Sequence, residues 1–255
     1  MSHERIIEAR VVCRGPDAAV LLVGGELPGG LVGLGEHPAE VAAATGATVR
    51  RPRRVVTDVQ RLGGWRGAWR HRDTIVFEGD AAAGHGGTWV PEPSLARSAL
   101  ASTLGLAPDL SGSAPTGIRV RSRQRFGAYG HVTDRDGNVL LARIAEGFPG
   151  AGLWHLPGGG TDFGEGVAEA LHREIAEETA QEGEIGELLR VNHRTAWAGG
   201  HVHFHAVRVV YAVRVARPTP ARVLEHNGST AVAAWLTPAE ARELELSDIA
   251  RDAVG

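Results

Sequence analysis

The chain has the same order of features twice, and this repetition constrains its fold most strongly. Each half begins with two β segments joined by a Gly- and Asp-containing turn. Each then has a Gly- and Pro-rich loop, an Ala- and Glu-rich helical segment and, later, a Trp followed by Pro. The stretch from Gly105 to Gly117 is rich in Gly, Pro and Ser, as linkers are. We predict an internal duplication, with domains at 1–115 and 116–255; the alternative is two unrelated α+β domains that share this order.

Composition excludes several broad classes of protein. Hydrophobic residues make up 43% of the 255 residues, enough to bury a core, and the formal net charge is −3. This mild negative charge argues against binding a polyanion over the whole surface, so no nucleic-acid partner is expected. No apolar run approaches a membrane span or a signal peptide, so no membrane association is expected. Cys13 is the one cysteine, which excludes an internal disulfide and is consistent with a cytoplasmic protein.

The segment from Leu156 to Gln181 combines a loop and a helix that suit metal chemistry. Its glycine run, 158–160, cannot form a helix interior and predicts a loop. From Val167 to Thr179 the chain lacks Gly and Pro and has an apolar residue every fourth position, which predicts an amphipathic helix. Another face of this helix gathers the carboxylates of Glu174, Glu177 and Glu178. A divalent cation would relieve their repulsion, and an all-oxygen ligand set suits Mg²⁺ or Mn²⁺.

This segment resembles the Nudix hydrolase signature, in which Gly, Glu, Arg-Glu, an apolar residue and Glu-Glu occur at fixed spacings. The residues at the required positions are Gly159, Glu165, Arg173, Glu174, Ile175, Glu177 and Glu178. The resemblance extends from about residue 123 to the C-terminus. It implies an α/β fold, here two Nudix-like α/β/α sandwiches with mixed β-sheets. It also implies a hydrolase of phosphoric anhydride bonds with Mg²⁺ or Mn²⁺ as cofactor.

The resemblance further implies a role for each residue of the motif. The expected metal ligands are the carbonyl of Gly158 and the carboxylates of Glu174, Glu177 and Glu178. Arg173 is expected to hold these glutamates in position. Glu165 is expected to serve as an outer metal ligand or to orient a water molecule.

The end of the motif departs from the family pattern. Ala180 stands where the family has glycine, and Gln181 stands where it has an apolar residue. Because that glycine normally ends the helix, we expect the helix to continue as far as Gly183. No metal ligand is lost by these changes, so they do not argue against activity.

Residues outside the motif are candidates for the general base and for phosphate contacts. The general base is a glutamate of the motif or a residue outside it, with Glu225 and His193 among the candidates. Arg143 follows the β segment Val139–Ala142. It is either a phosphate ligand or an exposed arginine at a strand end.

A histidine stripe and a tryptophan are further candidates for substrate contacts. His201, His203 and His205 alternate along one strand and therefore share a face. They either line the site, where His203 and His205 would contact substrate or hold a metal, or they form a solvent-facing stripe. Trp197 either stacks on a nucleobase or packs against the protein.

The first half keeps a glycine-rich loop but lacks the charged helix. Aligned with the motif, its helical segment has Ala39 in place of the arginine, and Ala43 and Ala44 in place of two glutamates. Glu40 alone remains at a ligand position, and one carboxylate does not hold Mg²⁺. We therefore expect a degenerate Nudix-like domain that forms an intra-chain pseudo-dimer with the catalytic half; a homodimer is the other expected assembly.

Three functions follow from the resemblance. The leading one is pyrophosphohydrolysis of a nucleoside diphosphate-linked or related small molecule. An alternative is a biosynthetic Nudix enzyme that acts on a prenyl diphosphate or a pathway nucleotide. The other is a non-catalytic Nudix-type sensor, against which the intact glutamates argue.

Overall fold

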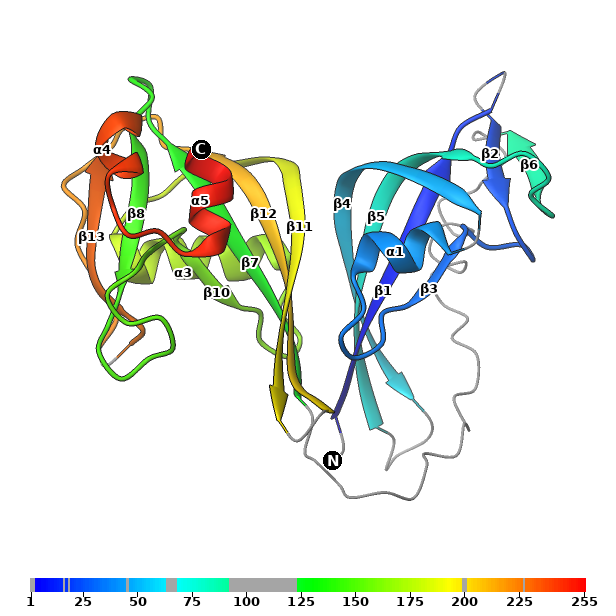
Figure 1. The fold of residues 1–255 in the computed structure, drawn as a ribbon, viewed down its shortest axis with the longest axis horizontal. Helices are drawn as coiled ribbons and strands as arrows, with labels where there is room; N and C mark the ends of the chain where they lie inside the picture. Colours follow the sequence, from blue (N-terminus) through cyan, green and yellow to red (C-terminus); the bar gives the residue numbers. More distant parts are fainter. Residues whose placement is uncertain are drawn as a thin grey trace. The chain divides into compact units, whose positions relative to one another are not determined.

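The computed structural model describes residues 3–15, 17, 19–44, 46–62, 68–91, 123–198, 201–226 and 228–255. These residues belong to two compact units (Figure 1). The first is Met1–Arg125 with His193–Ala206, and the second is Phe126–Asn192 with Val207–Gly255. Residues 193–206 therefore belong to the first unit, although residues of the second unit flank them in the sequence. The expected linker and the expected boundary at residues 115 and 116 lie outside the described residues.

A seven-stranded sheet is the centre of the second unit. Its strand order is β11-β12-β7-β8-β13, with β10 paired to β7 and β9 to β8. The strands are β7 (Arg123–Thr133), β8 (Val139–Ile144), β9 (Trp154–His155), β10 (Gly158–Gly160), β11 (Glu184–Ala198), β12 (His201–Arg214) and β13 (Thr230–Leu236). The turn between β7 and β8 has Gly137 at φ +82°, which favours glycine, and Asp134 accepts from the amides of Asp136 and Asn138.

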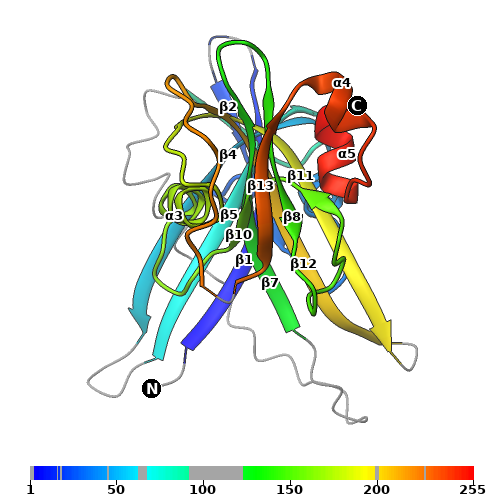
Figure 2. The same ribbon diagram turned by 90° about the vertical axis from the view of Figure 1, so that its left-hand side faces the viewer.

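Helices cover both faces of this sheet (Figure 2). On one face lies α3 (Val167–Thr179), and on the other lie α4 (Pro238–Arg242) and α5 (Asp248–Val254). The helix predicted at 167–179 is confirmed, and its apolar stripe is buried, with Leu171 at 0% and Ile175 at 1% exposure. Burying each such side chain contributes about 1.5–3 kcal/mol. The opposite face packs α4 and α5 against Val139, Leu141, Leu156 and Val210. The second unit is thus the predicted α/β/α sandwich.

The first unit contains a four-stranded sheet in the order β3-β1-β5-β4 and a separate β2-β6 pair. Because β1 runs parallel to β5 and antiparallel to β3, this sheet is mixed. Helix α1 (Pro38–Ala43) contacts β1, β3 and β4. The strands are β1 (His3–Cys13), β2 (Ala19–Leu22), β3 (Gly29–Leu31), β4 (Ala47–Leu62), β5 (Ala68–Ala81) and β6 (Thr88–Pro91).

The strand pairing of the first unit repeats that of the second in detail. The sequence Leu-Pro-Gly-Gly occurs at 27–30 and again at 156–159. Gly29 pairs with β1 at φ +139°, and Gly158 pairs with β7 at φ +138°. The Pro28 carbonyl accepts from the Val11 amide at 2.8 Å, and the Pro157 carbonyl accepts from the Gly130 amide at 2.9 Å. These matched contacts support an internal duplication.

The first-unit helix is shorter than its counterpart. Because the loops match without a gap from position 27, Pro38 at the start of α1 corresponds to Val167 at the start of α3. Helix α1 has 6 residues and α3 has 13. The expected alignment of Ala39 with Arg173 is therefore wrong. Helix α1 ends before the turns that would carry an arginine and glutamates, because Gly46 follows it at φ +84°, the usual helix stop.

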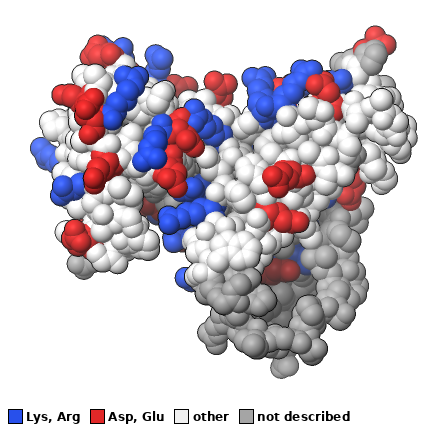
Figure 3. All heavy atoms as spheres, in the orientation of Figure 1, with Lys and Arg blue, Asp and Glu red and all other residues white. Residues whose placement is uncertain are grey.

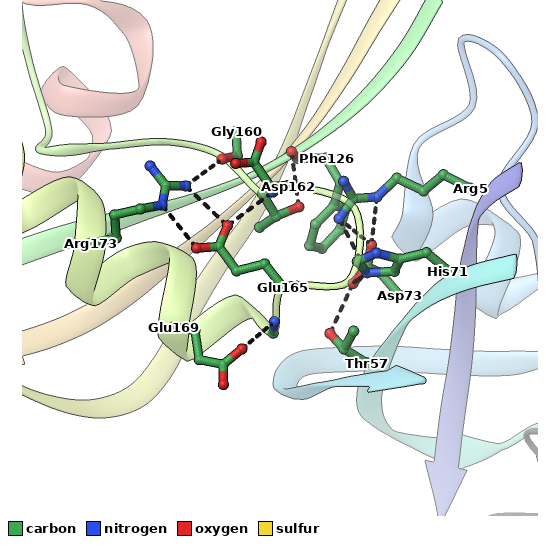
Figure 4. A network of polar contacts seen from close by, with 12 residues as sticks. Arg5, Thr57, His71, Asp73, Phe126, Gly160, Asp162, Glu165, Glu169 and Arg173 are labelled. Carbon is green, nitrogen blue, oxygen red and sulfur yellow. Dashed lines mark hydrogen bonds and ion pairs between the residues drawn. The ribbon is translucent and has the colours of Figure 1, made fainter. Parts of the chain in front are cut away.

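The first unit buries a polar network of its own (the Arg5 side of Figure 4). Asp73, fully buried, accepts hydrogen bonds from Arg5 Nε at 2.9 Å, Arg5 Nη2 at 2.8 Å and Thr57 Oγ1 at 2.9 Å. Both Arg5 donors contact Oδ2, whereas Thr57 contacts Oδ1, from which His71 Nε2 lies 3.2 Å away. Because both oxygens of Asp73 have partners, its burial is compensated, and we assign the network to structure.

Charged side chains of both signs lie interspersed over the described part of the face shown in Figure 3. On the first unit, some of them form cross-strand pairs, such as Arg51 with Glu78 at 2.8 Å. Such exposed pairs contribute about 0–1 kcal/mol each. In the described part of the chain, no helix is long and apolar enough to cross a membrane.

Candidate active site

Arg173, in the middle of α3, is the centre of a charged network that joins this helix to the preceding loop (Figure 4). Its Nε and Nη2 donate to the two oxygens of Glu165 at 2.9 and 3.0 Å, a bidentate pairing. Its Nη1 donates to Glu174 at 2.9 Å and to Glu177 at 3.3 Å, and Nη2 also donates to the Gly160 carbonyl at 3.3 Å. The hydrogen bond to Glu165, reinforced by Glu174, raises the pKa of Arg173 above its ordinary value. One guanidinium therefore holds the loop and the helix together.

The glycine-rich loop positions the carboxylate of Glu165. The Asp162 amide donates to Glu165 at 2.9 Å, and the Gly166 amide donates to Glu169 at 2.8 Å. Backbone donors at a helix N-terminus favour negative charge. Glu165 is thus fixed by the loop backbone on one side and by Arg173 on the other.

Glu178 lies deeper than the other glutamates of the motif. The residue is 4% exposed, whereas the Glu177 side chain is 44% exposed. Oε2 of Glu178 accepts from the Gly158 amide at 2.9 Å, and Oε1 of Glu178 accepts from Thr230 Oγ1 at 2.6 Å. Burial raises the pKa of Glu178 to about 7, although these two hydrogen bonds oppose the shift. Burial also raises the pKa of Glu174, against the opposing effect of Arg173.

The C-terminal end of α3 fixes a neighbouring loop. Ala180 adopts the left-handed conformation at φ +56° and ends the helix, so the expected continuation to Gly183 is wrong. The Leu224 and Glu225 amides donate to the Glu177 carbonyl at 2.7 and 3.0 Å. These bonds satisfy a carbonyl that the helix end leaves free and anchor Glu225 near the motif. The charge of Glu225 adds to the rise in the pKa of both Glu174 and Glu178.

Gln181, which replaces an apolar residue of the family pattern, is also explained by this loop. It is 2% exposed, and its side-chain amide donates to the Thr179 and Thr219 carbonyls, each at 3.2 Å. Its side-chain oxygen accepts from the Thr219 amide at 3.0 Å. Gln181 thus ties the loop that leads to Glu225 to the end of the helix.

Comparison with known proteins identifies this arrangement. A family model described as a NUDIX domain matches residues 122–254, about half of the chain. The chain belongs to the Nudix family. The predicted family is therefore confirmed, and the residues of the predicted motif lie on α3 and the preceding loop.

Individual Nudix relatives match over shorter stretches. The CTP pyrophosphohydrolase of Escherichia coli K12 is 36% identical over 78 residues, which is 31% of this chain and 57% of that protein. The nucleoside triphosphatase NudI of Escherichia coli O139:H28 is 43% identical over 69 residues, 26% of this chain and 43% of that protein. The chain thus spans about half the length of these curated relatives. The crystal structure of a MutT NUDIX hydrolase from Burkholderia pseudomallei is 31% identical, covers 52% of this chain and 97% of its own, and gives a TM-score of 0.44.

The donor set of the Nudix motif fits a hard divalent cation in its chemistry. Three glutamates and the Gly158 carbonyl offer oxygen alone, which Mg²⁺ and Mn²⁺ prefer. As they stand, however, no three His, Cys, Asp or Glu side chains among the described residues converge closely enough to hold a metal. Glu174 and Glu177 turn toward Arg173, whereas Glu178 accepts from the Gly158 amide and the Thr230 hydroxyl.

Arg143 is not brought together with the glutamates. It lies exposed on β8, two residues after Leu141, which packs against α4 and α5. Alternate residues of a strand share a face, so Arg143 faces away from α3. The described contacts thus favour the exposed-arginine interpretation, and its role as a phosphate ligand stays a prediction.

His203, His205 and Trp197 belong to the first unit. His205 is fully buried, and its Nδ1 lies 3.1 Å from Gln124 Nε2, so the solvent-facing interpretation is wrong for this residue. Trp197 is 65% exposed and donates to Thr195 Oγ1 at 3.2 Å. The side chain of His201 lies outside the described residues. Contacts of these residues with substrate stay a prediction.

The sequence did not indicate two contacts of Glu178. The partners of Glu178, the Gly158 amide and Thr230, lie 20 and 52 residues away along the chain. The Thr230 contact depends on strand pairing that brings the start of β13 beside α3. An isolated threonine at the start of a strand gives no local indication of such a role.

Proposed function

We propose that the second unit is a divalent-metal-dependent hydrolase of diphosphate bonds, with Mg²⁺ or Mn²⁺ as cofactor. The observation that carries this proposal is the joint placement of Arg173, its three carboxylate partners and buried Glu178 at one loop and helix. The relatives named as a CTP pyrophosphohydrolase and a nucleoside triphosphatase support nucleoside triphosphates as the first substrate class to test. Prenyl diphosphates and other pathway nucleotides are the second class.

Each residue of the site would have a separate role in the reaction. Glu174, Glu177 and Glu178, with the Gly158 carbonyl, would hold the cation. When bound, Mg²⁺ supplies positive charge that offsets the phosphate oxygens and makes a nearby water more acidic. Arg173 would keep Glu165 and Glu174 in place while the substrate binds. The bond formed joins the water oxygen to phosphorus, and the bond broken joins that phosphorus to the bridging oxygen.

Glu225 is the residue that we propose as general base. Its backbone is fixed on the end of α3, and its charge acts on Glu174 and Glu178. It is half-buried, and Gly228 faces its carboxylate, because an added Cβ at that glycine would collide with it. A glycine there leaves room for the side chain. Glu225 would accept the proton of the attacking water.

The first unit is proposed to be a degenerate, catalytically silent copy. It keeps the glycine loop and the strand pairing, but α1 ends before the turns that carry the catalytic residues in α3. We propose that it serves as the structural partner of the catalytic unit in the intra-chain pseudo-dimer, with a boundary near residue 115. The assembly state of the full chain, monomer or homodimer, follows from its mass measured by light scattering.

Product analysis of the full-length protein tests the proposal. The protein is incubated with Mg²⁺ in ¹⁸O-labelled water and a panel of nucleoside triphosphates, nucleotide sugars and prenyl diphosphates, and the products are identified by mass spectrometry. Hydrolysis of a diphosphate bond places the label on one phosphate product. The E177Q and E178Q variants should lose activity by orders of magnitude, and E225Q should lose turnover while binding Mn²⁺. The matched control is E187Q, on an exposed residue of β11.

The same panel separates the alternatives. Turnover confined to prenyl diphosphates would favour the biosynthetic enzyme. Tight binding of a nucleotide with no labelled product, in wild type and at saturating Mg²⁺, would favour the sensor. Wild-type rates in both E177Q and E178Q would disprove the assigned site.

A further inference from the structure

Glu178 is held differently from the other glutamates of the motif. Of the hydrogen bonds that Arg173 makes among the described residues, none goes to Glu178. The buried carboxylate is oriented by two neutral donors, the Gly158 amide on β10 and the Thr230 hydroxyl on β13. A donor aimed at a carboxylate gives a stronger hydrogen bond than one between neutral groups. The direction of this carboxylate therefore depends on Gly158 and Thr230.

Thr230 is itself firmly placed at the beginning of β13. It pairs with Ile144 of β8, and the register shifts between Thr230 and Val232. The preceding residue, Ser229, accepts from the Ala145 amide at 2.8 Å through its carbonyl. Thr230 is 9% exposed, and a β-branched side chain has few rotamers. Its hydroxyl therefore reaches Glu178 from a rigid position.

The two donors occupy one acceptor position on each oxygen of Glu178. A carboxylate oxygen can accept more than one partner, so each oxygen keeps a free direction for a cation. Without the Thr230 bond, the carboxylate could rotate about its last torsion, which is broad, with Gly158 as its one remaining donor. A rotated carboxylate would present a different oxygen to the cation.

We propose that Thr230 is a positioning residue for the metal site: its hydroxyl fixes Glu178 in the orientation that binds the cation. This inference rests on the proposed function for the identity of Glu178 as a metal ligand. Residues that orient metal ligands through hydrogen bonds typically change metal affinity by about 10–100-fold when they are replaced. Thr230 acts through Glu178 and does not itself touch the cation.

The test measures metal binding directly as well as activity. The T230V variant keeps the shape of the side chain and removes the hydroxyl, whereas T230S keeps the hydroxyl. The matched control is T74V: Thr74 is another buried strand threonine whose hydroxyl lies 3.5 Å from a buried glutamate, Glu8, in the first unit. Mn²⁺ binding is measured by electron paramagnetic resonance, and the Mg²⁺ concentration for half-maximal activity is measured by steady-state kinetics.

We expect T230V to weaken Mn²⁺ binding by about tenfold or more and to raise the half-activating Mg²⁺ concentration in parallel. T230S should restore both values to near wild type, and T74V should leave both unchanged. If T230V does not fold, as judged by circular dichroism, T230A compared with T230S gives the same contrast. Wild-type Mn²⁺ binding in the hydroxyl-free variant would overturn the proposal, as would equal weakening in T230V and T230S.

The two proposals fail in different ways. If wild type binds Mn²⁺ and T230V binds it more weakly, but neither hydrolyses any diphosphate, the positioning role stands and the hydrolase proposal fails. If wild type hydrolyses nucleotides and T230V has the same metal binding and the same half-activating Mg²⁺ concentration, the hydrolase stands and the positioning role fails. If wild type binds no Mn²⁺, the positioning role also fails.

Discussion

Glu36 and Glu165 hold the same place in two loops of one chain. Glu165 accepts from the Asp162 amide at 2.9 Å, and Glu36 accepts from the Gly33 amide at 2.6 Å, each three residues earlier. Each glutamate directly precedes the residue that caps the following helix. What differs is the arginine: Glu165 pairs with Arg173, whereas α1 ends before the corresponding turn. The same loop thus serves a charged site in one unit and only a helix start in the other.

This pair of glutamates supplies a matched test of the role proposed for Glu165. E165Q removes the charge that pairs with Nε and Nη2 of Arg173. Arg173 should then hold the loop less firmly against the helix. We expect turnover to fall by about tenfold or more, as for other groups that position metal ligands. E36Q makes the same chemical change in the same loop geometry and should leave turnover unchanged. Equal rates for E165Q and wild type would contradict the role given to this ion pair.

The sequence predicted the second unit better than the first. Helix α3 follows from a segment without Gly or Pro and from its apolar spacing, because these are local properties. In the first half, the helical segment is rich in Ala and Glu, so it can be aligned with α3 at several offsets that look alike. The expected alignment used the wrong offset. The signal that sets the register was the repeated Leu-Pro-Gly-Gly, at 27–30 and 156–159. Helix α1 ends before the positions that correspond to the arginine and glutamates of α3, and a comparison of single residues does not reveal such a shortening.

Contacts between distant segments account for most of what the sequence did not predict. Thr230 and Glu178 meet through the pairing of β13 with β8, and the buried position of His205 depends on groups from other segments. The left-handed Ala180 is a local feature, but alanine gives no indication of it. The loop that carries Glu225 docks through backbone amides, which all residues except proline possess. The motif therefore located the site, while its supporting contacts required the fold.

Alanine substitutions at the adjacent glycines Gly158 and Gly159 should have different effects, one mainly on stability and the other mainly on metal binding. A Cβ on Gly158, at φ +138°, would lie 2.3 Å from the Ala128 carbonyl oxygen and 2.6 Å from the Tyr129 Cα, which are backbone atoms. We expect G158A to lower the free energy of unfolding by about 2–4 kcal/mol. A Cβ on Gly159 would lie 2.6 Å from the Glu174 carboxylate, which can move aside.

G159A should therefore keep most of the stability and lose metal binding, because it displaces Glu174. Thermal unfolding and Mn²⁺ titration of both variants separate the two effects. The first-unit counterpart, G29A, gives a control for the clash alone, since its Cβ would lie 2.1 Å from the Ala9 carbonyl oxygen. Similar stabilities for G158A and G159A would show that the backbone clash is relieved in a way that the structure does not indicate.

Replacing Ala180 with glycine, the residue that the family pattern has at this position, should stabilise the protein. Alanine at φ +56° pays for a left-handed conformation that glycine adopts without a Cβ penalty. We expect A180G to raise the free energy of unfolding by about 0.5–1 kcal/mol. The control, A176G, places glycine inside α3 and should lower it by about 1 kcal/mol. Urea unfolding measures both, and a loss of stability in A180G would contradict the account of this helix end.

A histidine cluster in the first unit should make stability depend on pH. The rings of His193 and His205 lie 5.6 Å apart, and those of His37 and His193 lie 4.9 Å apart. Burial, with His193 adding to it, lowers the pKa of both His205 and His37, although Glu36 opposes this for His205 and Glu40 for His37. Below pH 6.5, the ordinary pKa of histidine, these two side chains take up protons more readily in the unfolded chain than in the folded protein. Stability is therefore present above pH 6.5 and is lost as the pH falls toward the folded pKa.

The H205Q variant isolates this effect. A glutamine can still accept from Gln124 but does not titrate, so the melting temperature should fall less steeply between about pH 7 and about pH 5 than in wild type. H172Q, on an exposed residue of α3, is the control and should follow the wild-type curve. Identical curves for H205Q and wild type would show that the buried cluster does not contribute.

Metal binding at the motif should depend on pH through Glu178. Burial raises the pKa of this carboxyl to about 7, from 4.5 in the unfolded chain. Between these values, the folded protein holds a proton that the unfolded chain has released. The stability that this proton contributes is fully present below pH 4.5 and is lost as the pH rises through about 7.

A cation needs the deprotonated carboxylate, so proton and metal compete for Glu178. Mn²⁺ affinity should rise by up to about tenfold per pH unit below the pKa of Glu178 and level off above it. In E178Q the affinity should be lower at every pH, and its rise with pH should be shallower, because Glu174 is then the one remaining ligand whose pKa burial raises. Titrations by electron paramagnetic resonance at a series of pH values measure both slopes. If Mn²⁺ affinity rises with pH equally steeply in wild type and E178Q, a group other than Glu178 controls binding of the cation. The control is E187Q, which leaves the site intact and should show the wild-type dependence of affinity on pH.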